Sequence, residues 1–250
     1  MVSSPRTTAI SRSKRETVMQ ATKAWAAPLC AVAMLAAATP AAADTPRDLL
    51  TQASFGVHDK AAALARIAAA RQGSAAILRY DGDDREAQLM QATAIGYQAK
   101  LTGDRGDALL ARRQFEVLVA REPRFADAWL ALGAWHIGAV YRLGGFIGRA
   151  ALGAQKSSGL QALDRAVALG GNRALFSGLS ALLRLQIDPA DPRGRALAEA
   201  AARAATPTPL DRILQRAAAA MLNTLRSGDN KLIKATASRL LPFGQLPGES

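Results

Sequence analysis

The apolar residues of this chain recur every three or four positions and not every second position. After Pro209 they form one continuous stripe, made by Leu210, Ile213, Leu214, Ala217, Met221, Leu222 and Leu225. This spacing places side chains on one face of an α-helix, whereas a half-buried strand would alternate. The sequence therefore predicts an all-α fold.

Glycine, proline and aspartate residues divide the pattern into helix-length pieces. The predicted helices are a short one before Gly56 and those over residues 59–79, 85–101, 104–121, 126–142, 157–169, 173–186, 192–205, 209–225 and 232–241. Two antiparallel helices cannot bury both of their faces alone, so neighbouring hairpins have to stack. We therefore expect an α-solenoid of about five antiparallel hairpins within residues 44–245.

Two groups of residues carry the spacing of one helical repeat. They are Ala111, Phe115 and Pro123, and then Trp129, Leu132 and Gly133. Counting back from both groups starts one unit at Ala92 and the next at Ala126, which is 34 residues later. This pattern resembles the tetratricopeptide repeat (TPR), although His136 occupies its tyrosine position. The resemblance implies helix pairs that approach closely at Ala111 and Gly133, with Trp129 in the core between pairs.

The resemblance also implies a concave groove that holds a peptide or a partner protein. The groove-facing positions would include Lys100, Leu130 and Ile137. They do not form the lysine and asparagine clamp with which some TPR domains hold a terminal carboxylate. We therefore expect an extended apolar segment as the ligand of such a groove.

Residues 143–158 interrupt the repeat. The repeat calls for a small residue near Gly145 and a large one four positions later. This pair reappears at Gly159 and Leu163, about 14 residues late. One interpretation is a glycine-rich, basic insertion on the binding face, since long insertions in compact repeats are often functional. The other is a first helix that is simply longer and kinked.

Aromatic and basic residues gather around this interruption. The predicted partner-binding residues there are Trp135, Tyr141, Arg142, Phe146, Arg149 and Lys156. The aromatic side chains would form an apolar wall, and the cations would face an anionic group on the partner. His136 is interpreted as a core substitute for tyrosine and not as a ligand or base.

The composition gives little support for catalysis. One cysteine and two histidines leave few residues for a metal site or a histidine-based hydrolase, so no cofactor and no metal is predicted. The chain lacks a phosphate-binding loop and the usual nucleophile motif. Its net charge of +12 is interleaved with acids, which argues against nucleic acid as a partner.

Residues 1–43 have the features of a secretory signal peptide. Arg12, Lys14 and Lys23 belong to a basic first part, and an apolar run over residues 25–38 follows. The run is too short for a membrane-spanning helix and contains Pro28. Met19 is an alternative start that would give a signal of ordinary length. We expect a periplasmic protein without a transmembrane segment after cleavage.

Two functions are favoured by these features, and a cell-envelope enzyme with its site in residues 143–158 is a weaker third option. The first is a non-catalytic periplasmic scaffold or adaptor that binds a peptide or protein partner in the cell envelope. The alternative is an accessory protein of an envelope transport system that binds a small apolar or anionic ligand. The TPR-like components of TRAP transporters, which are exported helical solenoids with a cavity, are the model for the alternative. An open groove would favour the adaptor, and a closed apolar cavity walled by Trp135 and residues 143–158 would favour the small ligand.

The signal assignment predicts a mature protein that begins at Asp44. Ala41 and Ala43 supply the small residues that a signal peptidase accommodates before its cleavage site. N-terminal sequencing of protein from the periplasmic fraction should return the sequence from Asp44 onward. Membrane-bound protein that keeps its basic first part would contradict this assignment.

Overall fold

A computed structural model describes residues 44–247, so the predicted signal segment lies outside the described residues. Within them the chain forms eleven α-helices, and the one β-type pairing is an isolated bridge between Arg173 and Ala205. The helices are α1 (Pro46–Phe55), α2 (Lys60–Tyr80), α3 (Arg85–Thr102), α4 (Arg105–Arg121), α5 (Ala126–Leu143), α6 (Gly145–Leu152), α7 (Lys156–Leu169), α8 (Ala174–Ile187), α9 (Pro192–Ala202), α10 (Pro209–Ser227) and α11 (Asn230–Leu240). The predicted all-α class is confirmed.

Side-chain caps fix where most of these helices begin. Thr45 and Thr208 each accept a hydrogen bond from the backbone three residues later, and Pro46 and Pro209 occupy the first helical position. Proline suits that position because its missing N–H would have no partner there. Aspartate caps five further helices through Asp59, Asp84, Asp104, Asp191 and Asp229. The predicted helix starts at Asp59 and Pro209 are therefore confirmed.

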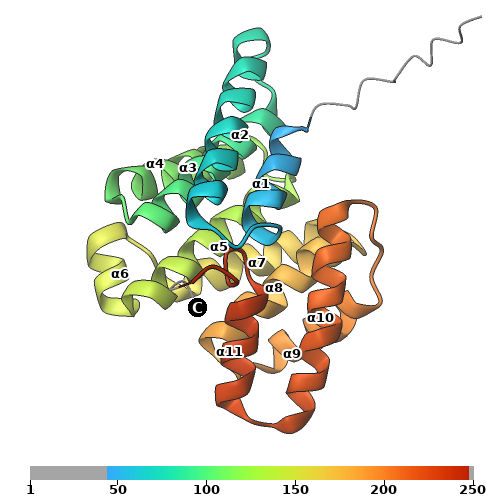
Figure 1. The fold of residues 1–250 in the computed structure, drawn as a ribbon. Coiled ribbons are helices and arrows are strands. Elements are labelled where there is room, and N and C mark those ends of the chain that lie inside the picture. The colour runs from blue at the N-terminus through green and yellow to red at the C-terminus, as the bar shows by residue number, and fades with distance from the viewer. Residues whose placement is uncertain (1–43, 248–250) are drawn as a thin grey trace, which may run out of the picture. The chain divides into compact units, whose positions relative to one another are not determined.

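Helix α5 lies between two groups of helices (Figure 1). One hydrophobic cluster joins α5 to α1–α4, and a second joins α5 to α7–α11. Leu132 belongs to the first cluster and Leu130 and Ile137 to the second. Trp129 is partly buried and packs against both clusters, while its indole N–H donates to the Pro123 carbonyl at 3.0 Å. Trp129 therefore contacts both clusters without being fully buried.

Glycine allows α5 and α7 to approach closely. A Cβ atom on Gly133 would lie 2.8 Å from Leu163, and one on Gly159 would lie 2.8 Å from Ile137. Because the later residue of α5 meets the earlier residue of α7, the two helices run antiparallel. Residues 144–155 therefore connect two helices that pack against each other.

The interrupting segment is itself helical. Helix α5 ends at Leu143, and Gly144 has φ 78° and ψ 161°, a backbone conformation that favours glycine. Helix α6 then runs from Gly145 to Leu152, and Gly153, which has φ 69°, caps its C-terminal end. The segment is thus neither an irregular loop nor a continuation of α5. Among residues 44–247 no helix has both the length and the apolarity to cross a membrane.

The chain after α11 returns to the first helices. The Phe243 N–H donates to the Ser54 carbonyl of α1 at 2.8 Å, and the Phe243 ring meets the Tyr97 ring of α3 edge-on at 4.8 Å. Phe243 and Leu246 are both buried in the first cluster. We call residues 241–247 the C-terminal segment. It ties the last helix to α1 and α3.

The close approach of α5 and α7 gives a prediction about stability. Gly133→Ala should lower the free energy of unfolding by about 1–3 kcal/mol, because the new methyl group overlaps Leu163. The matched control is Gly138→Ala on the same helix, where a Cβ meets no atom within 4 Å. This control should stabilise the protein by about 1 kcal/mol through helix propensity. Urea unfolding measures both, and equal stabilisation by the two variants would refute the packing described here.

Candidate functional site

A cavity of about 860 Å³ lies between the two groups of helices. Its walls come from α1, α3, α4, α5, α6, α8, α10, α11 and the C-terminal segment. The part contributed by α5 includes four small residues, namely Ala131, Ala134, Gly138 and Ala139. Small side chains leave the space between the helices unfilled. This cavity is the candidate binding site.

Five of the predicted site residues line this cavity. They are Lys100, Leu130, Trp135, Tyr141 and Arg142. The Trp135 indole N–H donates to the Ala108 carbonyl at 3.0 Å, which fixes the ring between α5 and α4. The segment 143–158 also reaches the cavity, through Ile147 and other residues of α6.

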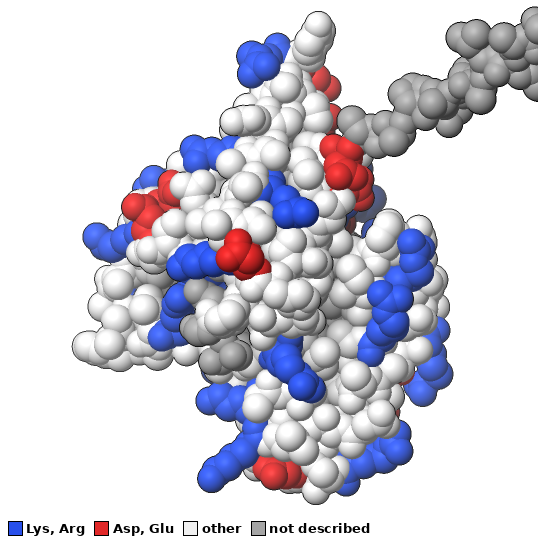
Figure 2. Space-filling model, viewed as in Figure 1, with Lys and Arg blue, Asp and Glu red and all other residues white. Residues whose placement is uncertain are grey.

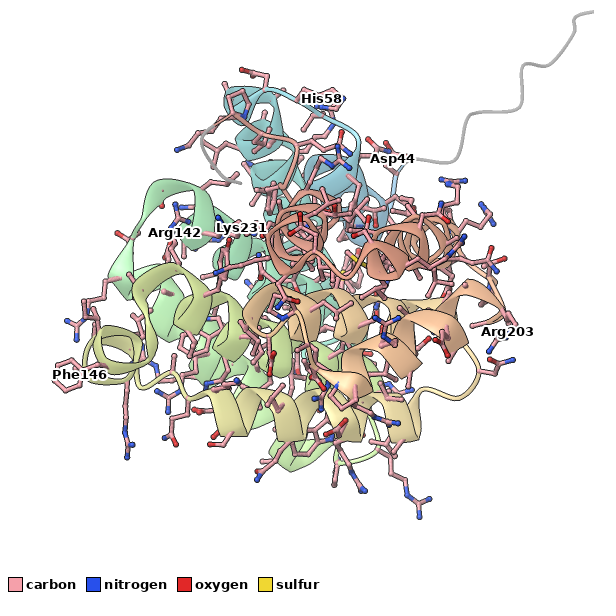
Figure 3. The ribbon with its side chains drawn as sticks, turned by 90° about the horizontal axis from the view of Figure 1, so that it is seen from below. Asp44, His58, Arg142, Phe146, Arg203 and Lys231 are labelled. Atoms are coloured by element: carbon pink, nitrogen blue, oxygen red, sulfur yellow. The ribbon has the colours of Figure 1, made fainter. Side chains whose placement is uncertain are left out.

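The other predicted residues lie elsewhere. Ile137 is fully buried against Gly159 of α7, so its assignment to a groove was wrong. The error arises because α5 packs against α7 on the face that would carry the groove. Phe146, Arg149 and Lys156 are exposed and are not among the residues that line the cavity. Figure 3 shows Phe146 at the outer edge of α6 with its ring directed away from the other helices.

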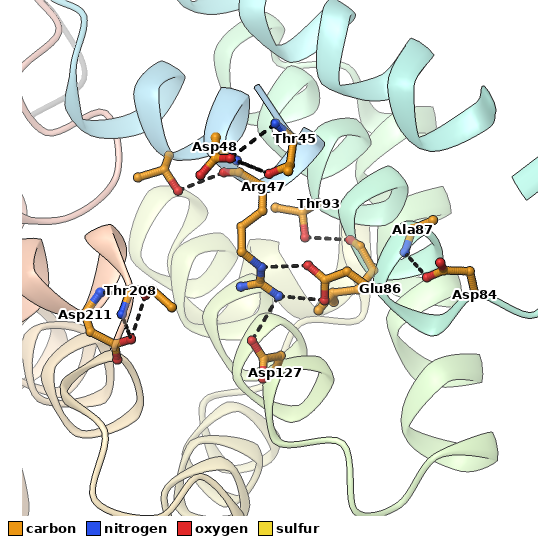
Figure 4. Close-up of polar contacts among 12 residues, drawn as sticks. Thr45, Arg47, Asp48, Asp84, Glu86, Ala87, Thr93, Asp127, Thr208 and Asp211 are labelled. Atoms are coloured by element: carbon orange, nitrogen blue, oxygen red, sulfur yellow. Dashed lines mark hydrogen bonds and ion pairs between the residues drawn. The ribbon is translucent and has the colours of Figure 1, made fainter. Parts of the chain in front are cut away.

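An ion-pair cluster stands at the α1 side of the cavity (Figure 4). Arg47 of α1 donates to both carboxylate oxygens of Glu86 on α3, at 2.6 and 2.8 Å, and lies 3.1 Å from Asp127 on α5. Burial alone would lower the pKa of Arg47, but the two carboxylates outweigh it and raise the pKa. Arg47 therefore stays charged and joins three helices at the cavity wall.

A second polar group lies on α8 and α11. The Gln186 amide donates to the Ser238 hydroxyl at 3.1 Å, and the same hydroxyl lies 3.1 Å from the Tyr141 hydroxyl. Lys234 stands 5.4 Å from the centre of the Tyr141 ring. All four residues line the cavity, so their polar groups can offer hydrogen bonds to a ligand.

The C-terminal segment supplies a third part of the wall. The Lys100 ammonium donates to the Pro242 carbonyl at 2.8 Å, and Arg142 donates to the Lys100 carbonyl. Burial raises the pKa of Tyr97, which lies beside Phe243, to about 12, against smaller opposing contributions from Ser54 and Arg47. Tyr97 is therefore a neutral hydrogen-bonding group at any physiological pH.

His136 is buried in the core behind the cavity wall. Its Nδ1 accepts a hydrogen bond from the Gln155 N–H at 3.3 Å, so the ring is neutral in this arrangement. Burial lowers the pKa of His136, and Arg112 lowers it further against an opposing contribution from Glu116. The interpretation of His136 as a core residue is confirmed by its 5% exposure.

Sequence reasoning missed most of the polar groups at the cavity. Arg47, Glu86 and Asp127 are separated by 39 and 41 positions in the chain, so no local motif unites them. Gln186 and Ser238 fall within predicted helices, but no motif or spacing in the sequence marks them as site residues. Among residues 44–247 no three histidine, cysteine or acidic side chains are placed to hold a metal ion.

Comparisons with known proteins do not assign the chain to a family. No protein-family model matches it, and searches of curated proteins and of solved structures find no significant similarity. Its function therefore has to be argued from the geometry of the chain itself.

The buried imidazole gives a prediction about pH. The pKa of His136 is lower in the folded protein than in the unfolded chain, so the unfolded state binds more protons between these two values. The stability that His136 contributes should be complete above about pH 6.5 and should decline as the pH falls toward the folded-state pKa. His136→Gln should remove this part of the decline in urea unfolding between about pH 7 and pH 5.

The control for this prediction is His58→Gln. His58 is exposed on the connection between α1 and α2, and its replacement should preserve the pH dependence of the wild type. If His136→Gln and the wild type lose stability in parallel, the buried imidazole does not determine this pH dependence.

Proposed function

We propose that this chain is an exported, non-catalytic, TPR-like binding protein that holds a small, mainly apolar ligand in its central cavity. The cavity carries the proposal. Its 860 Å³ falls within the range of about 300–1,000 Å³ that is usual for small-molecule sites. Its walls combine many apolar side chains with a few polar groups at separate places, as ligand sites do.

Two features support the TPR-like part of the proposal. Ala111 lies where α4 packs against Gly96 of α3, and Gly133 lies where α5 packs against α7. These are the small-residue positions that the repeat resemblance implies. The pairs α1–α2, α3–α4, α5–α7 and α8–α9 each pack together, which supports a series of stacked hairpins, while α10 and α11 pack against α8 as well as against each other.

The surroundings of the cavity favour a small ligand over an extended peptide. An adaptor of the TPR type uses an open concave groove along successive repeats, whereas here residues of α8, α10, α11 and the C-terminal segment line the same cavity as residues of α1 and α3. Trp135 of α5 and Ile147 of α6 also line the cavity, which supports the small-ligand alternative. The resemblance of residues 1–43 to a signal peptide supports a periplasmic location.

Filling the cavity should abolish ligand binding. Gly138 lines the cavity, and a side chain there begins in open space, so Gly138→Trp should occupy the site with little strain on the helix. We expect this variant to bind the apolar fluorescent probe N-phenyl-1-naphthylamine about tenfold or more weakly than the wild type. Fluorescence titration measures the affinity, and thermal melting verifies that the variant is folded.

The matched control is Ala219→Trp on an exposed position of α10, which should bind the probe as the wild type does. Undiminished binding by Gly138→Trp would refute the cavity as the ligand site. A partner protein that copurifies from the periplasm with both variants would instead support the adaptor function.

A further inference from the structure

Helix α6 carries an exposed apolar surface. Phe146 is 88% exposed and its neighbour Ile147 is 57% exposed. The helix lies at the margin of the fold in Figure 1, and Phe146 points outward in Figure 3. Leaving a phenyl ring in water gives up the stabilisation that its burial would provide. The ring therefore contributes little to the fold in its present position.

The backbone of α6 is firmly attached to the rest of the protein. Gly148 packs against the α5 backbone, where a Cβ atom would lie 3.4 Å from the Ala139 carbonyl oxygen. Arg105 donates to the Ala151 carbonyl at 3.0 Å, and Arg112 donates to the Leu152 carbonyl at 2.7 Å. Phe146 is thus presented to solvent by an anchored helix.

The charge around α6 has one sign over a long stretch of sequence. Between Asp127 and Asp164 the chain has no acidic residue. The same stretch contains three basic residues, Arg142, Arg149 and Lys156. Arg149 is three residues after Phe146, so both side chains project from the same side of α6. Both are exposed. Figure 2, viewed as in Figure 1, shows a largely uncharged surface at the left margin where α6 lies, with basic side chains beside it.

From these observations we infer that α6 docks on the surface of an anionic lipid bilayer. Phe146 and Ile147 enter the region between headgroups and acyl chains, and Arg149 contacts the anionic headgroups. Aromatic and apolar side chains with adjacent cations are the combination that holds amphipathic helices at a membrane surface. Two apolar side chains are too few for a stable protein interface, which usually buries about 1,200 Å² or more.

This docking does not depend on the proposed ligand, but it places the cavity near the lipid. Ile147 is both exposed and part of the cavity wall, so α6 lies between the cavity and the outer surface. A protein docked in this way would have its cavity next to the bilayer.

Vesicle flotation tests the inference. The chain from Asp44 onward is used, because the described residues contain both hydrophobic clusters and the apolar run of the signal would itself bind lipid. Wild-type protein should float with vesicles of phosphatidylcholine and phosphatidylglycerol at low salt, and only weakly with phosphatidylcholine alone. Phe146→Ser and Arg149→Glu should each lower the partition coefficient about tenfold.

Two control variants separate α6 from general effects of charge and hydrophobicity. Tyr80→Ser removes an aromatic side chain that is 99% exposed at the end of α2, and Arg203→Glu changes an exposed charge after α9, far from Phe146 in Figure 3. Both should partition as the wild type does. The inference is overturned if no variant differs from the wild type, if the controls lose binding equally, or if the wild type does not bind anionic vesicles. Failure here would leave probe binding in the cavity unchanged, so the two proposals fail separately.

Discussion

The close packing of α5 is the constraint on which the rest of the structure depends. This helix has one side in the cluster formed with α1–α4 and another in the cluster formed with α7–α11. Gly133 allows α7 to approach so closely that even a methyl group would overlap Leu163. A helix packed on both sides in this way holds two groups of helices in a fixed relation, and the cavity is the space that remains between them.

The same preference for small residues explains both the tight packing and the cavity. Alanine and glycine let helices come together where their backbones meet, as at Gly133 and Gly159. Where α5 lines the cavity, side chains such as Ala134 and Gly138 are too short to fill the space. The C-terminal segment then closes one side, with Phe243 against Tyr97 and Lys100 bound to Pro242. An apolar space of this kind has a shape that suits a ligand.

Local sequence rules account for the helices but only for part of the site. The apolar periodicity and the aspartate and proline starts place the predicted helices close to the observed ones, because these signals act within a few residues. The repeat spacing identifies the pairing of α5 with α7 across residues 143–158, but not that this segment forms α6. Ile137 was assigned to a groove because the sequence pattern does not show which face of α5 packs against α7, which is a tertiary contact. The return of Phe243 to α1 and the cluster around Arg47 depend on contacts between residues far apart in the chain, which one sequence does not reveal.

The central claim is that the cavity between the two groups of helices holds a small ligand. The most direct measurement is a crystal structure of the protein purified from its native host without added ligand. The account predicts continuous density for a mainly apolar molecule between Trp135 and Tyr141, enclosed by α5, α6 and the C-terminal segment. A cavity that contains only ordered water, or one that is closed by rearranged side chains, would contradict the account.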